Sequence, residues 1–509
     1  HGIFPRLVHM LLGAPKPTDE AFNLTFFAEI LRAYLASPGV IAHLDQGGQP
    51  AKKFVVLKGN IMKCLFLTSS PGYGHTRAAE AIDLVLKCRY PGIETEYLNI
   101  TSLIDTQVSD AIQEGYLRMT AEQPELYQKL YDMDENFYRQ LAGKIPADKK
   151  LISFLEEQQR RSFPEVAERS RFSLPALYKS FDSALLNTLI NGVCNRSKIP
   201  VGRLLTQGLL ILIYNILSAR LRKYIDECQP DVLIATQMYP NALLSHSKKN
   251  GLVKQPIIGV LTDYGLHGAW VRNTTDIYCV SHEKIAEELR EQGIAKDRIK
   301  VTGIPLVPAF SSIPTQSQAR AHLGLDSCPT VLITGGQCSI GVAAAAQQLL
   351  NDKNHNYQIL VAAGTNSVDM EALQKIVKHH QDRFKVYGWC KDMSYLICAA
   401  DVVVGKPGGL TLSETLACGR PFIATCCLGG QEAHNVQFLT ENNAGLQVEL
   451  DQLPGALSEL FSNRELLRSM KRNAYQLGKP DAAMAIVAEL ENIMQQDDDL
   501  FIEPTGALG

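Results

Sequence analysis

The stretch CLFLTSSPGYGHTRAAEAI, from Cys64 to Ile82, sets the expected fold of this chain. An apolar run leads into a glycine-containing loop, and a helix pattern follows the loop. The same order recurs in VLITGGQCSIGVAAAA, from Val331 to Ala346. A buried strand that passes through such a loop into a helix is typical of parallel sheets covered by helices. Two such openings predict an α/β protein with two domains.

Outward from these two stretches, short apolar runs alternate with helix-length segments through most of the chain. The runs are more numerous than the strands of one comfortable sheet, which favours two doubly wound sheets. The expected strands are 64–70, 94–100, 231–236, 256–262, 276–281 and 299–304, followed by 330–336, 358–364, 384–389, 401–406 and 421–425. The expected helices include 76–88, 283–292, 369–380 and 411–418.

A segment rich in proline and serine, at residues 305–314, separates the two groups of expected strands. Ligands of doubly wound sheets bind outside the carboxyl ends of the strands, so the two domains should face each other across one cleft. The predicted organisation is an N-terminal extension over 1–61, a first Rossmann-like domain over 62–308 with a helical basic insertion at about 141–226, a second Rossmann-like domain over 309–490, and a tail over 491–509.

Composition excludes several classes of protein. Among the 509 residues, 46% are hydrophobic and 20% are charged, as in ordinary folded domains. The 50 basic and 53 acidic residues give a net charge of −3, which offers no case for nucleic-acid binding. The 12 cysteines lack the spacings of zinc sites and are typical of a reduced, cytosolic protein. No apolar run reaches the roughly 18–20 residues of a membrane-spanning helix.

The loop from Ser69 to His75 ends the first expected strand and opens a helix at Thr76. Glycines let a backbone approach a ligand closely, and a helix N-terminus offers N–H groups. A histidine at this position titrates near neutral pH and could accept a proton from a hydroxyl nucleophile. The alternative is a turn whose histidine only caps the helix.

The most informative stretch is GKPGGLTLSETLACGRPFIATCCLGGQEAHN, from Gly405 to Asn435. A strand leads into a Gly-Gly turn, and we expect Thr411 and Ser413 to cap the helix that follows. Such a helix start binds phosphate without a metal. Glu414, one turn inside the helix, is expected to accept hydrogen bonds from a ribose. A second strand leads into the GGQE tetrapeptide, which suits sugar hydroxyls, whereas the alternative is a tight turn and a solvated helix start.

This stretch strongly resembles the nucleotide-sugar domain of GT-B glycosyltransferases in the diacylglycerol glycosyltransferase group. That group contains plant-type monogalactosyldiacylglycerol synthases and bacterial processive diacylglycerol glucosyltransferases, and is related to the peptidoglycan enzyme that adds N-acetylglucosamine to lipid I. GYGHTRAAEAI resembles the family's Gly-x-Gly-His helix start. Thr262-Asp-Tyr264, His267, Trp270 and the sequence VTGIP at 301–305 also match. The resemblance spans roughly residues 62–485.

The resemblance implies an inverting transfer of a hexose from a UDP-sugar, with no metal and no other cofactor required. It implies His75 as the general base, and either Asp263 or His267 could orient it or take that role instead. The acceptor side would contain Gly72, Gly74, Tyr264 and His267. On the donor side, the resemblance implies that Glu414 holds the ribose and that Trp389 and Cys390 border the uracil. The diphosphate would be cradled by Gly408, Gly409 and Thr411, and Gly336 and Ser339 would close over the phosphates. The sugar would contact Gln431 and Glu432, with Asn435 beside them.

A diacylglycerol acceptor requires contact with a bilayer. We predict this contact at Arg169, Arg171 and Phe172, in a region where basic residues outnumber acidic ones. The apolar segment 204–224 either lies on the same surface or, in its first part, forms a core helix on the first sheet. The expected location is cytoplasmic, peripherally on the inner face of the membrane. The expected partners are the UDP-sugar, the lipid acceptor and an anionic membrane surface, with no nucleic acid and no obligatory protein partner.

Two other kinds of function fit the same residues. One is a different enzyme on this fold, either a transferase for a non-lipid acceptor or a UDP-sugar epimerase. The other is a non-catalytic protein that binds a nucleotide sugar or a lipid. The sequence Asp132-Met-Asp134 matches the DxD of metal-dependent glycosyltransferases, but it lies in a helix-like stretch and not at a strand end. The donor stays open among UDP-glucose, UDP-galactose and UDP-N-acetylglucosamine.

Overall fold

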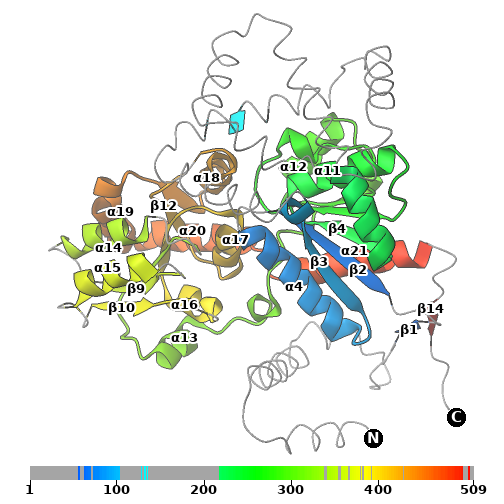
Figure 1. Ribbon diagram of the computed structural model, residues 1–509. Coiled ribbons are helices and arrows are strands. Elements are labelled where there is room, and N and C mark those ends of the chain that lie inside the picture. The colour runs from blue at the N-terminus through cyan, green and yellow to red at the C-terminus, as the bar shows by residue number, and fades with distance from the viewer. Residues whose placement is uncertain are drawn as a thin grey trace, which may run out of the picture. The chain divides into compact units, whose positions relative to one another are not determined.

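The computed structural model of the chain describes residues 55–57, 62–69, 73–103, 128, 131–132, 135, 217–336, 341–352, 357–364, 367–378, 380, 383–390, 392–427, 429–496 and 502–504. Two large sheets lie within one compact unit, Val55–Glu503. A separate pair of short strands, β1 (Val55–Leu57) and β14 (Ile502–Pro504), makes a two-stranded sheet. Figure 1 shows the elements that surround the two large sheets.

The first large sheet has six parallel strands in the order β3-β2-β4-β5-β6-β7. Each of its strands overlaps one of the six expected in the first group. The chain places β3 on one side of β2 and β4 on the other, which is the kind of reversal beside which doubly wound sheets bind ligands. The strands are β2 (Lys63–Thr68), β3 (Glu94–Asn99), β4 (Val232–Ala235), β5 (Ile257–Val260), β6 (Ile277–Cys279) and β7 (Ile299–Lys300).

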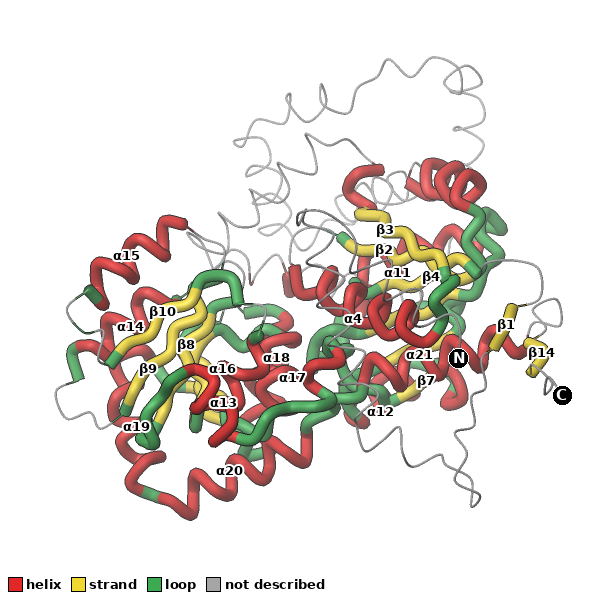
Figure 2. The backbone as a smooth tube through the Cα atoms, turned by 90° about the horizontal axis from the view of Figure 1, so that it is seen from below, coloured by secondary structure: helices red, strands yellow, loops and turns green. Residues whose placement is uncertain are grey.

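Alternate side chains of these strands point to opposite faces, and helices cover both faces (Figure 2). Cys64 and Phe66 pack with α4 (Tyr73–Arg89) and α21 (Ala482–Gln496). Leu65 and Leu67 pack with α11 (Met238–Lys249) and the helical residues 217–228. The remaining elements of this half are α12 (Glu283–Glu291) and the 3₁₀ turns η1 (Ile100–Leu103), η2 (Gly268–Trp270), η3 (Lys296–Arg298) and η4 (Pro308–Phe310).

The last long helix, α21, belongs to the core of the first sheet although it follows the second sheet in the chain. Ile486 and Leu490 are fully buried in the same cluster as Phe66. The Glu491 carboxylate pairs with Arg89 of α4 at 2.7 Å. The end of the chain's second half is therefore a structural part of its first half.

Of the apolar segment 204–224, the structure describes the residues from Leu217 onwards. From there, Leu217 and Leu221 are buried against the first sheet in one cluster with Leu233. The Ser247 hydroxyl donates a hydrogen bond to the buried Ser218 hydroxyl at 2.8 Å. Residues 217–224 thus form a core helix, whereas residues 204–216, which make up almost all of the predicted core helix, lie outside the described residues.

The second large sheet is also parallel and six-stranded, in the order β10-β9-β8-β11-β12-β13. Five of its strands overlap the second group of expected strands, and the sixth, β13, was not expected. Its strands are β8 (Thr330–Thr334), β9 (Gln358–Ala362), β10 (Phe384–Tyr387), β11 (Val402–Gly405), β12 (Phe422–Ala424) and β13 (Gly445–Gln447). The predicted class, an α/β protein with two doubly wound sheets, is confirmed.

Helices cover both faces of this sheet as well. Leu332 and Val403 point to one face, in a core with α13 (Gln316–Leu323), α16 (Met393–Ala399), α17 (Gly409–Ala417) and α18 (Gln431–Glu441). Val331 and Val402 point to the other face, in a core with α14 (Val342–Leu350), α15 (Ser367–Val377) and α19 (Leu453–Ser462). Helix α20 (Arg464–Leu477) contributes to both cores, and the 3₁₀ turn η5 (Leu450–Gln452) precedes α19.

A search of the described residues finds no helix with both the length and the apolar character needed to cross a bilayer. In the same residues, no three His, Cys, Asp or Glu side chains are grouped so that they could hold a metal ion.

Candidate functional site

His75 lies in the first turn of α4, which follows the loop after β2. Its Nδ1 atom is 2.7 Å from the hydroxyl oxygen of Thr262, two residues beyond β5. Burial lowers the pKa of His75 to about 4, and a hydrogen bond to the Thr236 carbonyl offsets part of this effect. The imidazole is therefore neutral at pH 7, so one of its ring nitrogens can accept a proton.

Asp263, the next residue along the chain, interacts with the second half of the chain. Its Oδ1 atom accepts a hydrogen bond from Asn435 Nδ2 at 3.2 Å. Burial raises the pKa of Asp263 to about 7; the Asn435 hydrogen bond lowers it, and the nearby Glu432 carboxylate raises it. The side-chain hydrogen-bond partner of His75 is thus the Thr262 hydroxyl, whereas the Asp263 carboxyl bonds to Asn435.

His267 caps the short turn η2 from inside the protein. Its Nδ1 atom accepts a hydrogen bond from the Ala269 backbone N–H at 3.1 Å, and its ring meets that of Tyr131 edge-on at 5.0 Å. A neutral imidazole that accepts at Nδ1 carries its proton on Nε2. In this arrangement His267 has no lone pair left for an acceptor hydroxyl, so its geometry supports a structural role more than a catalytic one.

Tyr264 and Asn435 join the two halves of the chain. The Tyr264 backbone N–H donates to Asn435 Oδ1 at 2.8 Å, its hydroxyl lies 2.8 Å from Ser413 Oγ, and its ring stacks on Phe438 at 4.3 Å. Asn435 is fully buried, and its Nδ2 also donates to the Pro407 carbonyl at 2.9 Å. Both side chains therefore hold the acceptor-side loop after β5 against α17 and α18.

Helix α17 begins earlier than the sequence predicted. Its first residue is Gly409, and its N-cap Gly408 makes no side-chain hydrogen bond, whereas Thr411 and Ser413 were expected as caps. Ser413 donates instead to the Gly409 carbonyl at 2.8 Å. The glycine pair allows this early start, because Gly408 is extended (φ −67°, ψ 143°) and leads directly into the helix. Backbone groups, without a capping side chain, form the start of α17, which suits an anion.

The first residue of α17 lies against the residue that contacts His75. A Cβ atom on Gly409 would overlap the carbonyl oxygen of Thr262 and would come within 2.9 Å of Asp263 Oδ1. One residue on, Leu410 Cβ lies 4.0 Å from where a Cβ on Gly74 of α4 would stand. The N-terminal ends of α4 and α17 therefore meet, as Figure 1 shows. Both ends carry partial positive charge, so together they favour an anionic ligand.

Glu414 lies one turn inside α17, near Arg77 of α4. Burial raises the pKa of Glu414 to about 7, and the Arg77 guanidinium acts in the opposite direction. Arg77 itself pairs with Glu80 at 2.7 Å. Both protonation states of Glu414 are able to accept a hydrogen bond from a ribose hydroxyl. Without a ligand, the ionised form is disfavoured by its surroundings.

We expect Glu414→Gln to raise the melting temperature of the ligand-free protein at pH 8 and to change it little at pH 4. The carboxyl ionises at its ordinary value of 4.5 when unfolded, but holds its proton up to about pH 7 when folded. The protonated Glu414 carboxyl thus contributes to the free energy of unfolding at low pH, and this contribution is lost as the pH rises through the folded pKa. The gain at pH 8 should be about 2 kcal/mol.

Thermal unfolding at the two pH values tests this expectation. Glu459→Gln is the matched control: Glu459 is exposed on α19, so this replacement should leave the melting temperature unchanged at both pH values. Equal melting temperatures of wild type and Glu414→Gln at pH 8 would contradict the expected stabilisation.

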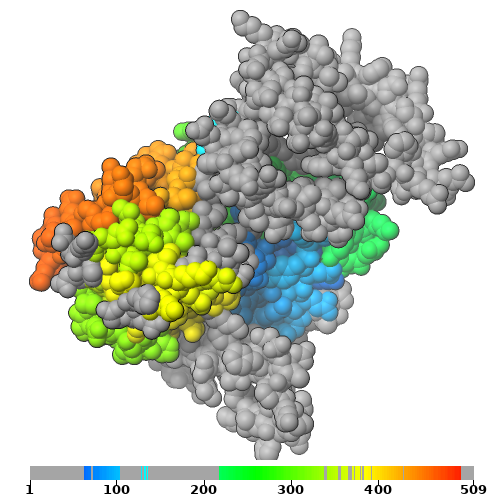
Figure 3. Space-filling view, turned by 60° about the vertical axis from the view of Figure 1, so that its left-hand side comes forward, coloured from blue at the N-terminus to red at the C-terminus, as the bar shows by residue number. Residues whose placement is uncertain are grey.

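Trp389 follows β10 and is 45% exposed, one of the few large apolar side chains on the described surface. Its ring meets Tyr73 of α4 edge-on, with centroids 5.9 Å apart. Figure 3 shows the blue surface of the first half next to the yellow surface of this region. Burial raises the pKa of the adjacent Cys390 thiol, which therefore stays protonated at neutral pH. An exposed indole at this place is available to stack on a planar base.

The GGQE tetrapeptide opens α18. Gly429 (φ +80°) and Gly430 (φ +58°) both have the positive φ that favours glycine, so the chain can turn sharply into the helix. The Gln128 side-chain oxygen accepts a hydrogen bond from the Gly430 N–H, and the Tyr131 ring would overlap a Cβ there. Two residues from the first half of the chain thus cover the turn.

The polar side chains of the tetrapeptide differ in their surroundings. Gln431 is the first residue of α18 and is partly exposed. Glu432 is buried, and its carboxylate forms an ion pair with Lys406 Nζ, which comes from the end of β11. The pair fixes a carboxylate next to the start of α17. This position suits a group that orients a polar, uncharged ligand.

Two family models and several known proteins match this chain. Residues 202–306 match the family model of monogalactosyldiacylglycerol (MGDG) synthase, and residues 330–486 match the glycosyltransferase family 28 C-terminal domain. The processive diacylglycerol beta-glucosyltransferase of Bacillus pumilus (strain SAFR-032) is 31% identical over 286 residues, which cover 55% of this chain and 73% of that protein. The chain belongs to the diacylglycerol glycosyltransferase family.

Two further members show how broad this family is. The processive diacylglycerol beta-glucosyltransferase of Bacillus subtilis (strain 168) is 28% identical over 285 residues, 55% of this chain and 73% of that protein. Monogalactosyldiacylglycerol synthase 3, chloroplastic, of Arabidopsis thaliana is 30% identical over 291 residues, 53% of this chain and 61% of that protein. The two segments that match family models contain Thr262 and the start of α17, respectively.

The described part of this diacylglycerol glycosyltransferase leaves some predictions untested. Gly336 lies just after β8 with φ +67°. The predicted residues Gly72, Ser339, Arg169, Arg171 and Phe172 lie outside the described residues, as does Asp134 of the DxD match.

Sequence reasoning missed several residues of the site. Thr262 and Lys406 stand inside quoted motifs, so their position could have pointed to them. Tyr73 precedes the Gly-His pair and was treated as part of the loop. Gln128 and Tyr131 come from a stretch that carries no local signal, and only their contacts with Gly430 and His267 show where they act.

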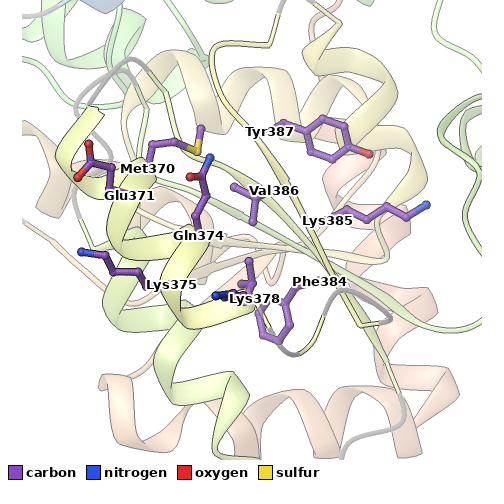
Figure 4. A pocket seen from close by; sticks show the side chains of 10 residues that line it. Met370, Glu371, Gln374, Lys375, Lys378, Phe384, Lys385, Val386 and Tyr387 are labelled. Carbon is purple, nitrogen blue, oxygen red and sulfur yellow. The ribbon is translucent and has the colours of Figure 1, made fainter.

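A pocket between α15 and β10 is lined by residues other than those of the candidate site. Figure 4 shows its lining side chains, which include Met370 and Phe384 beside Lys375, Lys378 and Lys385. None of the predicted site residues lines it. Its position against β10, the edge strand of the second sheet, makes it a surface feature of that half.

Proposed function

We propose that this diacylglycerol glycosyltransferase moves a hexose from a UDP-sugar to the free hydroxyl of a diacylglycerol, at the cytoplasmic face of a membrane. The observation that carries the proposal is the meeting of His75 with the start of α17 through Thr262. A neutral base and an anion-binding helix start are thus close to each other. The lipid acceptor rests on relatives that are named as diacylglycerol glycosyltransferases.

In the proposed reaction, the acceptor oxygen attacks C1 of the sugar and forms a new C1–O bond. The bond between C1 and the diphosphate oxygen breaks at the same time, on the opposite side of C1, so the configuration inverts. His75 takes the acceptor proton. UDP leaves towards Gly408, Gly409 and Thr411, where backbone N–H groups and the helix dipole offset its developing charge. No metal is required in this proposal.

The surroundings of each side chain support the remaining donor contacts of this proposal. The exposed Trp389 is placed to stack on the uracil, with Cys390 beside it. Glu414 holds the ribose hydroxyls. Gln431 contacts the sugar, and Lys406 keeps the carboxylate of Glu432 in position for the same task.

The reaction can be tested with purified protein and anionic liposomes that contain diacylglycerol. Each of the three labelled UDP-sugars is added separately, with EDTA present, and the label is followed into the organic phase. Labelled glycolipid from one donor would establish the reaction, the sugar and the independence from metal. Liposomes without diacylglycerol serve as the matched control.

Other outcomes separate the rival functions. Conversion of the UDP-sugar with no lipid present would indicate an epimerase. Label transferred to a water-soluble product would indicate a non-lipid acceptor. Binding of UDP without any turnover, with all three donors, would indicate a non-catalytic binding protein.

A further inference from the structure

Thr262 contacts both sides of the site with two different groups. Its hydroxyl oxygen lies 2.7 Å from His75 Nδ1 and 3.4 Å from the carbonyl oxygen of Thr236. Its own carbonyl oxygen lies against Gly409, so closely that a Cβ on Gly409 would overlap it. Thr262 is only 5% exposed. One buried residue therefore touches both the base and the start of the phosphate-binding helix.

The direction of the hydrogen bonds follows from what each group can donate. The Thr236 carbonyl can only accept, and the Thr262 hydroxyl has a single hydrogen. When that hydrogen points to the Thr236 carbonyl, the hydroxyl oxygen must accept from His75 Nδ1–H. The opposite direction would take the Thr262 donor away from the Thr236 carbonyl, whose other hydrogen-bond partner is His75, and would place the imidazole proton on Nε2. The carbonyl therefore favours the chain that runs from His75 Nδ1 through Thr262 to Thr236.

We propose that Thr262 is the positioning residue of the base: its hydroxyl keeps the proton of neutral His75 on Nδ1, so that Nε2 has the lone pair that takes the acceptor proton. This inference rests on the proposed function for its catalytic consequence, but not for the tautomer itself. The Thr262 carbonyl fixes the same residue against Gly409, so the distance between the base and the leaving diphosphate is set by one residue.

A neutral hydroxyl differs from the carboxylate that often orients a catalytic histidine. A carboxylate stabilises the imidazolium and raises the pKa of the base. Here the Asp263 carboxyl bonds to Asn435, and the burial of His75 keeps its pKa low. The base is therefore oriented without being made more basic.

Two variants separate the hydroxyl from the shape of the side chain. Thr262→Val keeps the branched shape and removes the hydroxyl, whereas Thr262→Ser keeps the hydroxyl. The tautomer of His75 is read from the side-chain ¹⁵N shifts of protein labelled at histidine, and the spectrum of His75→Gln assigns the signals. The same proteins are assayed for kcat and donor KM, and UDP affinity and melting temperature report on folding.

The expected result is a wild-type His75 with the proton on Nδ1, a loss of this preference in Thr262→Val and its retention in Thr262→Ser. In Thr262→Val, kcat should fall at least about tenfold while donor KM and UDP affinity stay within twofold. Thr262→Ser should recover most of the rate. A merely structural role would change the melting temperature without changing the tautomer.

The inference is overturned when wild-type His75 carries its proton on Nε2, or when Thr262→Val leaves the tautomer or kcat unchanged. The failure of the proposed function looks different. In that case wild type transfers no hexose to diacylglycerol, yet the tautomer still depends on the Thr262 hydroxyl.

Discussion

We expect His75→Ala to lower kcat by at least about 100-fold and to leave the affinity for UDP within twofold of wild type. A general base contributes about 10²–10⁴-fold to a rate, and alanine cannot take the acceptor proton. UDP binding should persist, because the contacts assigned to UDP come from α17 and from the loop after β10. Steady-state kinetics with the labelled donor and calorimetric titration with UDP measure the two quantities.

Two controls accompany this variant. His75→Gln keeps a polar side chain but has no basic nitrogen, so it should be as inactive as the alanine variant. His322→Ala removes an exposed histidine on α13 and should behave as wild type. A fully active His75→Ala enzyme would remove His75 from the mechanism. In wild type, the low pKa of His75 predicts that the acidic limb of kcat/KM falls near pH 4 and not near 6.5.

Gly409→Ala should abolish donor binding and lower the melting temperature by about 1–3 °C. The added methyl group would overlap the Thr262 carbonyl oxygen, which is backbone and cannot swing aside. Helix α17 and the loop after β5 must therefore move apart. That movement would disturb the hydrogen bonds of Asn435 with Asp263 and with Tyr264. Overpacking of this kind typically costs about 1–3 kcal/mol.

Gly408→Ala is the matched control for the fold. A Cβ on Gly408 would meet only the flexible end of Lys406, at 3.7 Å, and its φ of −67° suits any residue. Thermal unfolding and UDP titration of both variants test the expectation. A Gly409→Ala protein that unfolds at the wild-type temperature and binds UDP normally would show that the close approach of Thr262 to α17 is not needed.

The strands of both sheets could be predicted because each is a short apolar run, and such runs need no long-range information. The exception is β13, Gly445–Gln447, which is three residues long and contains no β-branched residue. It becomes a strand because β12 offers it an open edge to pair with. The starts of α4 and α17 were placed two or three residues too late, because glycine was taken to exclude helix at Gly74 and Gly409.

The site could be predicted only as far as its motifs. The motifs indicated His75 and Glu414 as site residues, since each follows a strand and a glycine turn. They did not give the partners of these residues. Thr262 and His75 are 187 positions apart, and Asn435 and Asp263 are 172 apart. The first contact depends on the order of the strands within the first sheet, and the second depends on how the two halves pack. No local pattern encodes either of them. This is why Asp263 was considered as the partner of His75, whereas its carboxyl bonds to Asn435.

The return of α21 to the first sheet has a consequence for how the chain is made. A ribosome delivers the N-terminal half first, but Ile486 and Leu490, which complete the core around Phe66, emerge only after the second sheet. Until then, the face of the first sheet that α4 covers lacks the second helix of its cover and exposes apolar side chains to solvent. The nascent first half is therefore a candidate for chaperone binding, and neither half is a natural unit for separate expression. Synthesis of the second sheet must therefore precede completion of the base-bearing half.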